Sequence, residues 1–243
     1  MSYISFALFS TLSIIWVTSL WFDVQQQPRL GHHWYIYKLV MLTNLNFVLD
    51  VFYSVIVVMG YKFDRLKRIA DFMHFTSIFP VGIVTCGLFW GLYAIDPALV
   101  MPDWIAKLIP WWLNHITHTY PIVYILLDSY FHKRTAPKNI TCWILSAALV
   151  FIYFIVIGYV RYFDGYWLYP ILTFFAIEHF VISYILAFFG FFLLTKSACL
   201  LNNFFREFNL ENLNFVFLFQ TNHQQHQLSW GQRKQKNNIN LYI

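Results

Sequence analysis

The chain has 243 residues, of which 59% are hydrophobic and only 11% are charged, whereas a soluble domain carries about 25% charged residues. The mean hydropathy of +0.56 and the aromatic content of 22% indicate an integral membrane protein and exclude an ordinary soluble domain. The net charge of +5 is not gathered on a soluble module, so we expect no nucleic-acid partner. The three cysteines form no CxxC pair and predict neither a disulfide framework nor a zinc or redox motif.

Apolar runs of roughly 18 to 25 residues are long enough to cross the hydrocarbon core as helices. The sequence contains six such runs, which are approximately 3–22, 36–60, 76–95, 111–128, 141–160 and 167–195. The first run lacks the basic start of a cleaved signal peptide, so we expect it to be retained. Pro80 and Pro121 lie inside the third and fourth runs and are expected to kink those helices. The predicted fold is an all-α, multi-pass transmembrane helical bundle of about six spans.

The basic residues predict the orientation of these spans. Four of the 16 Lys and Arg residues lie on one side of the predicted bundle, namely Arg29, Lys38, Lys107 and Arg161. The other twelve lie in the loops 61–75 and 129–140 and in the segment after the sixth run, from Lys196 onward. Because cytoplasmic loops carry the excess of Lys and Arg, both termini are expected in the cytoplasm. The sequence does not distinguish the plasma membrane from the endoplasmic reticulum.

The last part of the chain differs in composition from the spans. From residue 206 onward the sequence is rich in Asn and Gln, and polar tracts of this kind rarely form a packed core. We therefore expect two parts, a six-span transmembrane domain over 1–205 and a flexible cytoplasmic tail over 206–243.

Polar side chains occur inside three of the predicted spans, where they are costly and usually face the protein interior. They are Thr43, Asn44, Asn46 and Asp50 in the second run, Asn114, His115, Thr117 and His118 in the fourth, and Glu178 and His179 in the sixth. Thr43 and His118 each lie about seven residues, or roughly 10 Å, from the outer end of their predicted helices. The spacing of Thr43, Asn46 and Asp50 places them on one helix face. We expect these polar groups to form one layer nearer the outer side.

A threonine hydroxyl becomes a nucleophile only when a neighbouring base takes its proton. Neutral histidine is the natural base near physiological pH, and His118 lies at the depth of Thr43. The alternative is that both residues are structural, since a membrane-buried threonine commonly bonds a backbone carbonyl.

Several stretches resemble the family of the androgen-induced gene one protein and the androgen-dependent tissue-factor-pathway-inhibitor-regulating protein. The matching stretches are "KLVMLTNLNFVLDVFYSV", "FPVGIVTCGLFWGLYAIDPALV", "IPWWLNHITHTYPIVYILLD" and "GYWLYPIL". The resemblance covers roughly residues 1–205, and its WLNHxxHT block at 112–119 is the most specific part.

This resemblance implies a membrane hydrolase of fatty acid esters of hydroxy fatty acids, acting without metal or other cofactor. The family's threonine nucleophile aligns with Thr43, and its histidine aligns with His118. Around this pair, the predicted supporting or substrate-lining residues are Asn44, Asn46, Asp50, Asn114, His115, Glu178 and His179. Asn44, Asn46 and Asn114 are alternative donors to the oxyanion, and His115 is expected beside the catalytic pair rather than in it. The predicted partners are the lipid ester and the membrane.

Three other interpretations stay open from the sequence. A metal-dependent membrane enzyme would need more histidines at depth than His115, His118 and His179. A non-enzymatic transporter or regulatory protein would also carry polar stripes on its helices. A catalytically inactive relative would retain the same motifs.

Overall fold

The computed structural model describes residues 3–25, 38–101, 106–107 and 109–207, and no strand occurs among them. The chain divides into two compact units, Met1–Leu200 and Leu201–Ile243. The account below concerns the first unit. The tail predicted at 206–243 lies almost entirely outside the described residues, so its boundary and its flexibility stay predictions.

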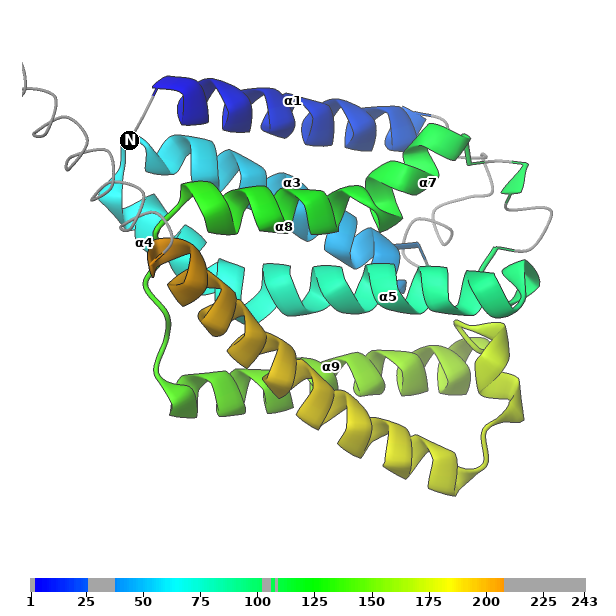
Figure 1. Cartoon of the computed structure of the whole chain (residues 1–243). Helices are drawn as coiled ribbons and strands as arrows, with labels where there is room; N and C mark the ends of the chain where they lie inside the picture. Colours follow the sequence, from blue (N-terminus) through cyan, green and yellow to red (C-terminus); the bar gives the residue numbers. More distant parts are fainter. Residues whose placement is uncertain (1–2, 26–37, 102–105, 108, 208–243) are drawn as a thin grey trace, which may run out of the picture. The chain divides into compact units, whose positions relative to one another are not determined.

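The described residues form an all-α structure (Figure 1). Its α-helices are α1 (Tyr3–Gln25), α3 (Leu42–Gly60), α4 (Asp64–Met73), α5 (Phe79–Ile95), α7 (Trp111–His118), α8 (Tyr120–Phe131) and α9 (Asn139–Asp164). Shorter helical segments are the π-helix His74–Ile78 and the 3₁₀ helices Pro97–Leu99 and Pro170–Phe174. The last helix runs over Ile177–Glu207.

Five helices are long and apolar enough to cross a membrane. They are Tyr3–Gln25, Leu42–Gly60, Asp64–Ile95, Asn139–Asp164 and Ile177–Glu207. The predicted multi-pass helical bundle is confirmed by this count and by the all-helical structure. The predicted span at 111–128 differs from the others, because it consists of two short helices, α7 and α8, that meet at a bend (Figure 1).

The bend between α7 and α8 has a clear origin in the sequence. Pro121 lies at the start of α8 and has no N–H to donate to the carbonyl one turn earlier. Thr119 leaves the helical region with φ −123° and ψ −45°, and α7 therefore ends at His118. The kink expected at Pro121 is confirmed as a full interruption.

Helix α3 is central within this unit and contacts α1, α4, α5 and α7. Aromatic side chains fill the space between α1, α3 and α8. The Trp16 ring lies 5.7 Å from Phe47 and 6.2 Å from Tyr124, and Phe9 lies 5.7 Å from Tyr124. All four are fully buried, so the polar groups on α3 and α7 are held on a rigid frame.

Two predicted boundaries are wrong. The region 61–75 is not all loop, because α4 begins at Asp64 and continues through the π-helix into α5 as one 32-residue helix. Helix α4 is amphipathic and carries several charged residues, so its sequence does not form an apolar run. The last helix begins at Ile177 rather than at 167, because Pro170 starts a separate 3₁₀ helix and Gly165 ends α9 with φ +75°.

Candidate functional site

Thr43 and His118 meet where the first turn of α3 faces the last residue of α7. Thr43 Oγ1 lies 3.1 Å from His118 Nε2. The imidazole is buried and the threonine is half-buried. Although α3 begins at Leu42 rather than near 36, the structure brings these two predicted residues within hydrogen-bond distance.

The other imidazole nitrogen of His118 faces oxygens of its own helix. Nδ1 lies 2.9 Å from Asn114 Oδ1, 3.0 Å from the Asn114 carbonyl oxygen and 3.0 Å from Thr117 Oγ1. The two Asn114 oxygens can only accept, so Nδ1 carries the proton of the neutral ring. Nε2 then presents its lone pair to the Thr43 hydroxyl, which donates to it. This is the geometry of a nucleophile, its base and an orienting group.

Two aromatic residues of α5 fix the position of the imidazole. The Phe89 ring stacks on His118 with centroids 3.6 Å apart and an angle of 16°. Trp90 Nε1 donates to the His118 carbonyl at 2.9 Å and to Thr119 Oγ1 at 3.2 Å. Carbonyl groups at a helix end lack intrahelical donors, so Trp90 satisfies the end of α7 that the Pro121 bend exposes.

A pair of tyrosines holds the start of α3. Tyr169 accepts a hydrogen bond at its hydroxyl from the Leu42 N–H at 2.9 Å. The Tyr153 and Tyr169 hydroxyl oxygens lie 2.8 Å apart. The first N–H groups of a helix have no intrahelical acceptor, and this bond ties the residue before Thr43 to the segment between α9 and the last helix.

Asn46 and Asp50, predicted beside the pair, are completely buried and bonded to each other. Asn46 Nδ2 donates to Asp50 Oδ2 at 2.8 Å. Asn44 is half-buried near Thr43. Asn114 is buried, and its side-chain oxygen faces Nδ1 of His118. A donor to the oxyanion must be an N–H group, so the choice among Asn44, Asn46 and Asn114 stays a prediction.

His115, Glu178 and His179 are exposed, whereas His118 is buried, and their supporting role stays a prediction. His115 is exposed, and its Nδ1 lies 3.1 Å from Thr119 Oγ1 while its ring stacks on Trp90. Glu178 and His179 are exposed in the first turn of the last helix. Their expected depth was based on a helix start at 167, and the contacts of the described residues do not bring either side chain to the Thr43–His118 pair.

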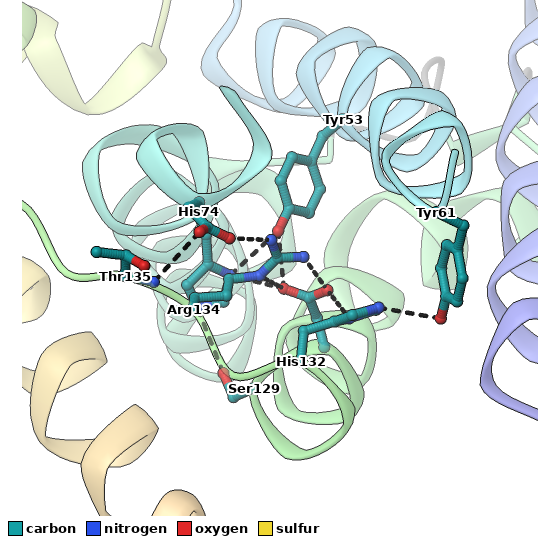
Figure 2. Close-up of polar contacts among 9 residues, drawn as sticks. Tyr53, Tyr61, His74, Ser129, His132, Arg134 and Thr135 are labelled. Atoms are coloured by element: carbon teal, nitrogen blue, oxygen red, sulfur yellow. Dashed lines mark hydrogen bonds and ion pairs between the residues drawn. The ribbon is translucent and has the colours of Figure 1, made fainter. Parts of the chain in front are cut away.

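A second buried polar group, which was not predicted from the sequence, lies at the other end of α3 and α8, and we call it the Asp128 cluster (Figure 2). It consists of Tyr53, Tyr61, Asp71, His74, Asp128, Ser129, His132, Arg134 and Thr135. Arg134 donates to Asp128 from Nε at 2.6 Å and from Nη2 at 2.5 Å, and to Asp71 at 3.0 Å. Burial favours the uncharged form of Arg134, but the Asp128 carboxylate outweighs it and raises the pKa of the guanidinium. The ion pair is therefore charged on both sides.

Three members of the Asp128 cluster have the distances of a serine hydrolase triad. Ser129 Oγ lies 3.3 Å from His74 Nε2, and His74 Nδ1 lies 2.9 Å from Asp128 Oδ2. However, Ser129 is 3% exposed and the other two are 0% exposed. The Asp128 oxygens also accept from Tyr53, His132 and Arg134. A fully enclosed and fully bonded group of this kind stabilises a helix junction, whereas Thr43 is half-buried.

No group of three or more His, Cys, Asp or Glu side chains is arranged to hold a metal ion within residues 3–25, 38–101, 106–107 and 109–207. The expectation of metal-independent chemistry stays a prediction.

The fold and this site define a multi-pass, all-α membrane protein with a threonine–histidine pair between two helices. The family model described as FAR-17a/AIG1-like protein matches residues 5–203. The chain belongs to this family, and the resemblance expected from its motifs is confirmed.

Individual relatives match more distantly. The androgen-induced gene 1 protein of Homo sapiens is 29% identical over 111 residues, which cover 46% of this chain and 47% of the relative. The androgen-dependent TFPI-regulating protein of Mesocricetus auratus is 28% identical over 144 residues, covering 54% and 60%. Its Homo sapiens counterpart is 25% identical over 181 residues, covering 69% and 78%. The match thus spans about half the length of the first relative and three fifths of the second. No solved structure matches the chain.

Proposed function

We propose that this protein is an intramembrane lipid hydrolase that cleaves fatty acid esters of hydroxy fatty acids. The observation that carries the proposal is the 3.1 Å approach of Thr43 Oγ1 to His118 Nε2. A threonine inside an apolar bundle has no α-amino group to activate it, and a neutral imidazole with its lone pair on the hydroxyl supplies that base. The ester class comes from the family resemblance of the sequence motifs.

The proposed reaction has two halves. In the first, Thr43 Oγ attacks the ester carbonyl carbon while His118 Nε2 takes the hydroxyl proton. His118 then returns this proton to the departing hydroxy fatty acid, which leaves an acyl group on Thr43. In the second half, water attacks the acyl carbon, and the same nitrogen carries its proton to Thr43 Oγ. Asn114 keeps the ring in the required tautomer by accepting from Nδ1.

An apolar groove provides a place for the acyl chain in this proposal. The groove lies between α9 and the last helix and is lined by Phe151, Phe154, Ile155, Phe180, Val181 and Tyr184. Phe154 and Tyr184 also pack against the buried cluster of Val81, Val150 and Phe191, and so does Leu42, which precedes Thr43. A chain in this groove would place its carboxyl end near α3, which supports a lipid rather than a water-soluble ester.

The test is hydrolysis of such an ester by membranes that contain wild type, Thr43→Ala or His118→Ala at matched protein levels. Release of fatty acid and hydroxy fatty acid by wild type, with a loss of at least roughly 10²-fold in each variant, is the expected result. Thr195→Ala is the matched control, because Thr195 is buried and donates within its own helix, to the Phe191 carbonyl. Equal activity in all four proteins would exclude the pair as catalytic residues. Absence of activity in folded wild type would favour a transport or regulatory role.

A further inference from the structure

Asn46 and Asp50 form an incompletely bonded polar pair inside the bundle, one turn inward from Thr43. Both side chains are 0% exposed, and the Asn46 amide donates to Asp50 Oδ2 at 2.8 Å. Among the described residues, neither Asn46 Oδ1 nor Asp50 Oδ1 has a hydrogen-bond partner. Exchanging the amide nitrogen and oxygen would still leave one amide atom and one carboxyl oxygen without partners.

The residues around this pair bring further unpartnered hydroxyl groups. Thr85 on α5 and Tyr124 on α8 are buried, and their hydroxyls also lack partners within the described part of the chain. Asp50 lies close to Tyr124 and to Cys86, the residue after Thr85. Buried polar atoms without partners thus occur on α3, α5 and α8, and Asp50 interacts electrostatically with groups of both neighbouring helices.

Close packing at Gly82 places α5 directly against Asn46. A Cβ atom built on Gly82 would lie 3.9 Å from Asn46 Oδ1 and 3.6 Å from the Pro121 side chain. Thr85 follows Gly82 by three residues and shares its helix face. The Gly82 face of α5, which carries Thr85, therefore packs against Asn46 of α3.

Polar atoms buried without partners are costly, and proteins satisfy them with internal water that makes about three hydrogen bonds. A water molecule donates twice, which matches Asn46 Oδ1 and Asp50 Oδ1, and it accepts from a hydroxyl such as that of Thr85 or Tyr124. We propose that Asn46 and Asp50 bind a buried water molecule, and that this water hydrolyses the acyl-threonine formed at Thr43.

The water site rests on the proposed function, because it supplies the water that hydrolyses the acyl-threonine in the second half of that reaction. Asn46 follows Thr43 by three residues, so the two side chains lie on one face of α3, about 5 Å apart along its axis. On attack, the water turns one of its two O–H groups from its acceptor to His118 Nε2. Its oxygen bonds to the acyl carbon, and that proton moves to Nε2. The bond from that carbon to Thr43 Oγ breaks, and the proton passes from His118 to Oγ. The products are the free fatty acid and the regenerated threonine.

The experiment uses the full-length detergent-solubilised protein with p-nitrophenyl decanoate as the ester. Asn46→Leu/Asp50→Leu replaces both polar groups with apolar ones of similar shape, so no half-bonded group is left behind. We expect this variant to release nitrophenol once per enzyme and then to turn over slowly, with a loss of turnover at least 10-fold greater than its loss in the rate of the first release. Mass spectrometry should detect the acyl group on Thr43. Hydroxylamine, which attacks the acyl group directly, should restore turnover.

Ser146→Ala serves as the control, because Ser146 on α9 is also buried with an unpartnered hydroxyl within the described residues. It should behave like wild type. Unchanged turnover in the double variant, or an equal loss of the first nitrophenol release and of turnover, would overturn the water site. If the double variant does not fold, as judged by its thermal unfolding, Asn46→Leu alone is read by the same criteria. If Thr43→Ala hydrolyses the ester as well as wild type, the proposed function itself fails.

Discussion

The imidazole Nδ1 of His118 lies 2.9 Å from the side-chain oxygen of Asn114, one turn earlier on the same helix. This contact selects the tautomer in which Nε2 is free to act on Thr43. The Asn114 amide therefore lies at the imidazole nitrogen where many serine hydrolases have a carboxylate. Because the amide is neutral, it adds no charge inside the membrane.

Replacing Asn114 by Leu should lower kcat, because the ring loses its orientation and its tautomer preference. The expected loss is about 10- to 100-fold, which is less than removal of the base itself costs. Asn114→Gln or Asn114→Asp should retain more activity than Asn114→Leu, since each keeps an acceptor oxygen. The measurement is kcat and KM for the lipid ester in purified protein. A kcat that is the same in Asn114→Leu and wild type would show that the contact does not orient the base.

Tyr169→Phe removes the acceptor of the Leu42 N–H at the start of α3. We expect a several-fold lower kcat because the first turn of the helix, which carries Thr43, loses its anchor. Tyr153→Phe is the comparison variant. It removes the hydroxyl that lies 2.8 Å from Tyr169 and also interacts with the Leu42 backbone, but it keeps the 2.9 Å bond from the Leu42 N–H to Tyr169. Its effect should be smaller. If the two variants lose activity equally, the tyrosine pair acts as a unit rather than through the Leu42 bond.

The groove between α9 and the last helix predicts how chain length is selected. Val181→Trp should fill part of this groove, which Val181 lines together with Phe154 and Tyr184. KM should rise for esters with long acyl chains and change little for short ones, because only the long chains extend into the narrowed part. The measurement is kcat/KM over a series of chain lengths. Val17→Trp, on the exposed face of α1, is the control. A uniform change across the series would place the chain elsewhere.

The sequence predicted the helices better than it predicted the polar contacts. Apolar runs identified α1 and α9 within a few residues, because a helix of that length and composition is already specified by its hydrophobicity. They missed α4, whose charged residues make its average hydropathy low. The sequence also grouped Arg134 with the solvent-exposed loop charges, whereas the structure buries it against Asp128. Only the fold brings the Arg134 guanidinium to the Asp128 carboxylate.

The approach of Thr43 to His118 was predictable because both residues lie about seven residues inside their predicted spans, and an imidazole at membrane depth usually faces the protein interior. The supporting contacts were not. Phe89 and Trp90 belong to an aromatic-rich apolar run, and the sequence does not show which of its aromatic residues contact His118. Only the packing of α5 against α7 determines that. Glu178 and His179 were predicted to line the site because they are polar residues in an apolar run. The helix starts ten residues later than expected, and both residues are exposed in its first turn.

Arg134→Leu should strongly destabilise the protein, because it leaves Asp128 and Asp71 buried without their cation. Breaking a buried ion pair on one side costs about 3–5 kcal/mol, so the unfolding temperature in detergent should fall clearly. Lys133→Leu is the control, since Lys133 is the adjacent residue and is exposed. The double variant Asp128→Leu/Arg134→Leu should recover part of the loss, because neither charge is then left alone. A single Arg134→Leu variant as stable as Lys133→Leu would mean that water or lipid reaches the carboxylates, and that the Asp128 cluster does not hold the ends of α3, α4 and α8 together.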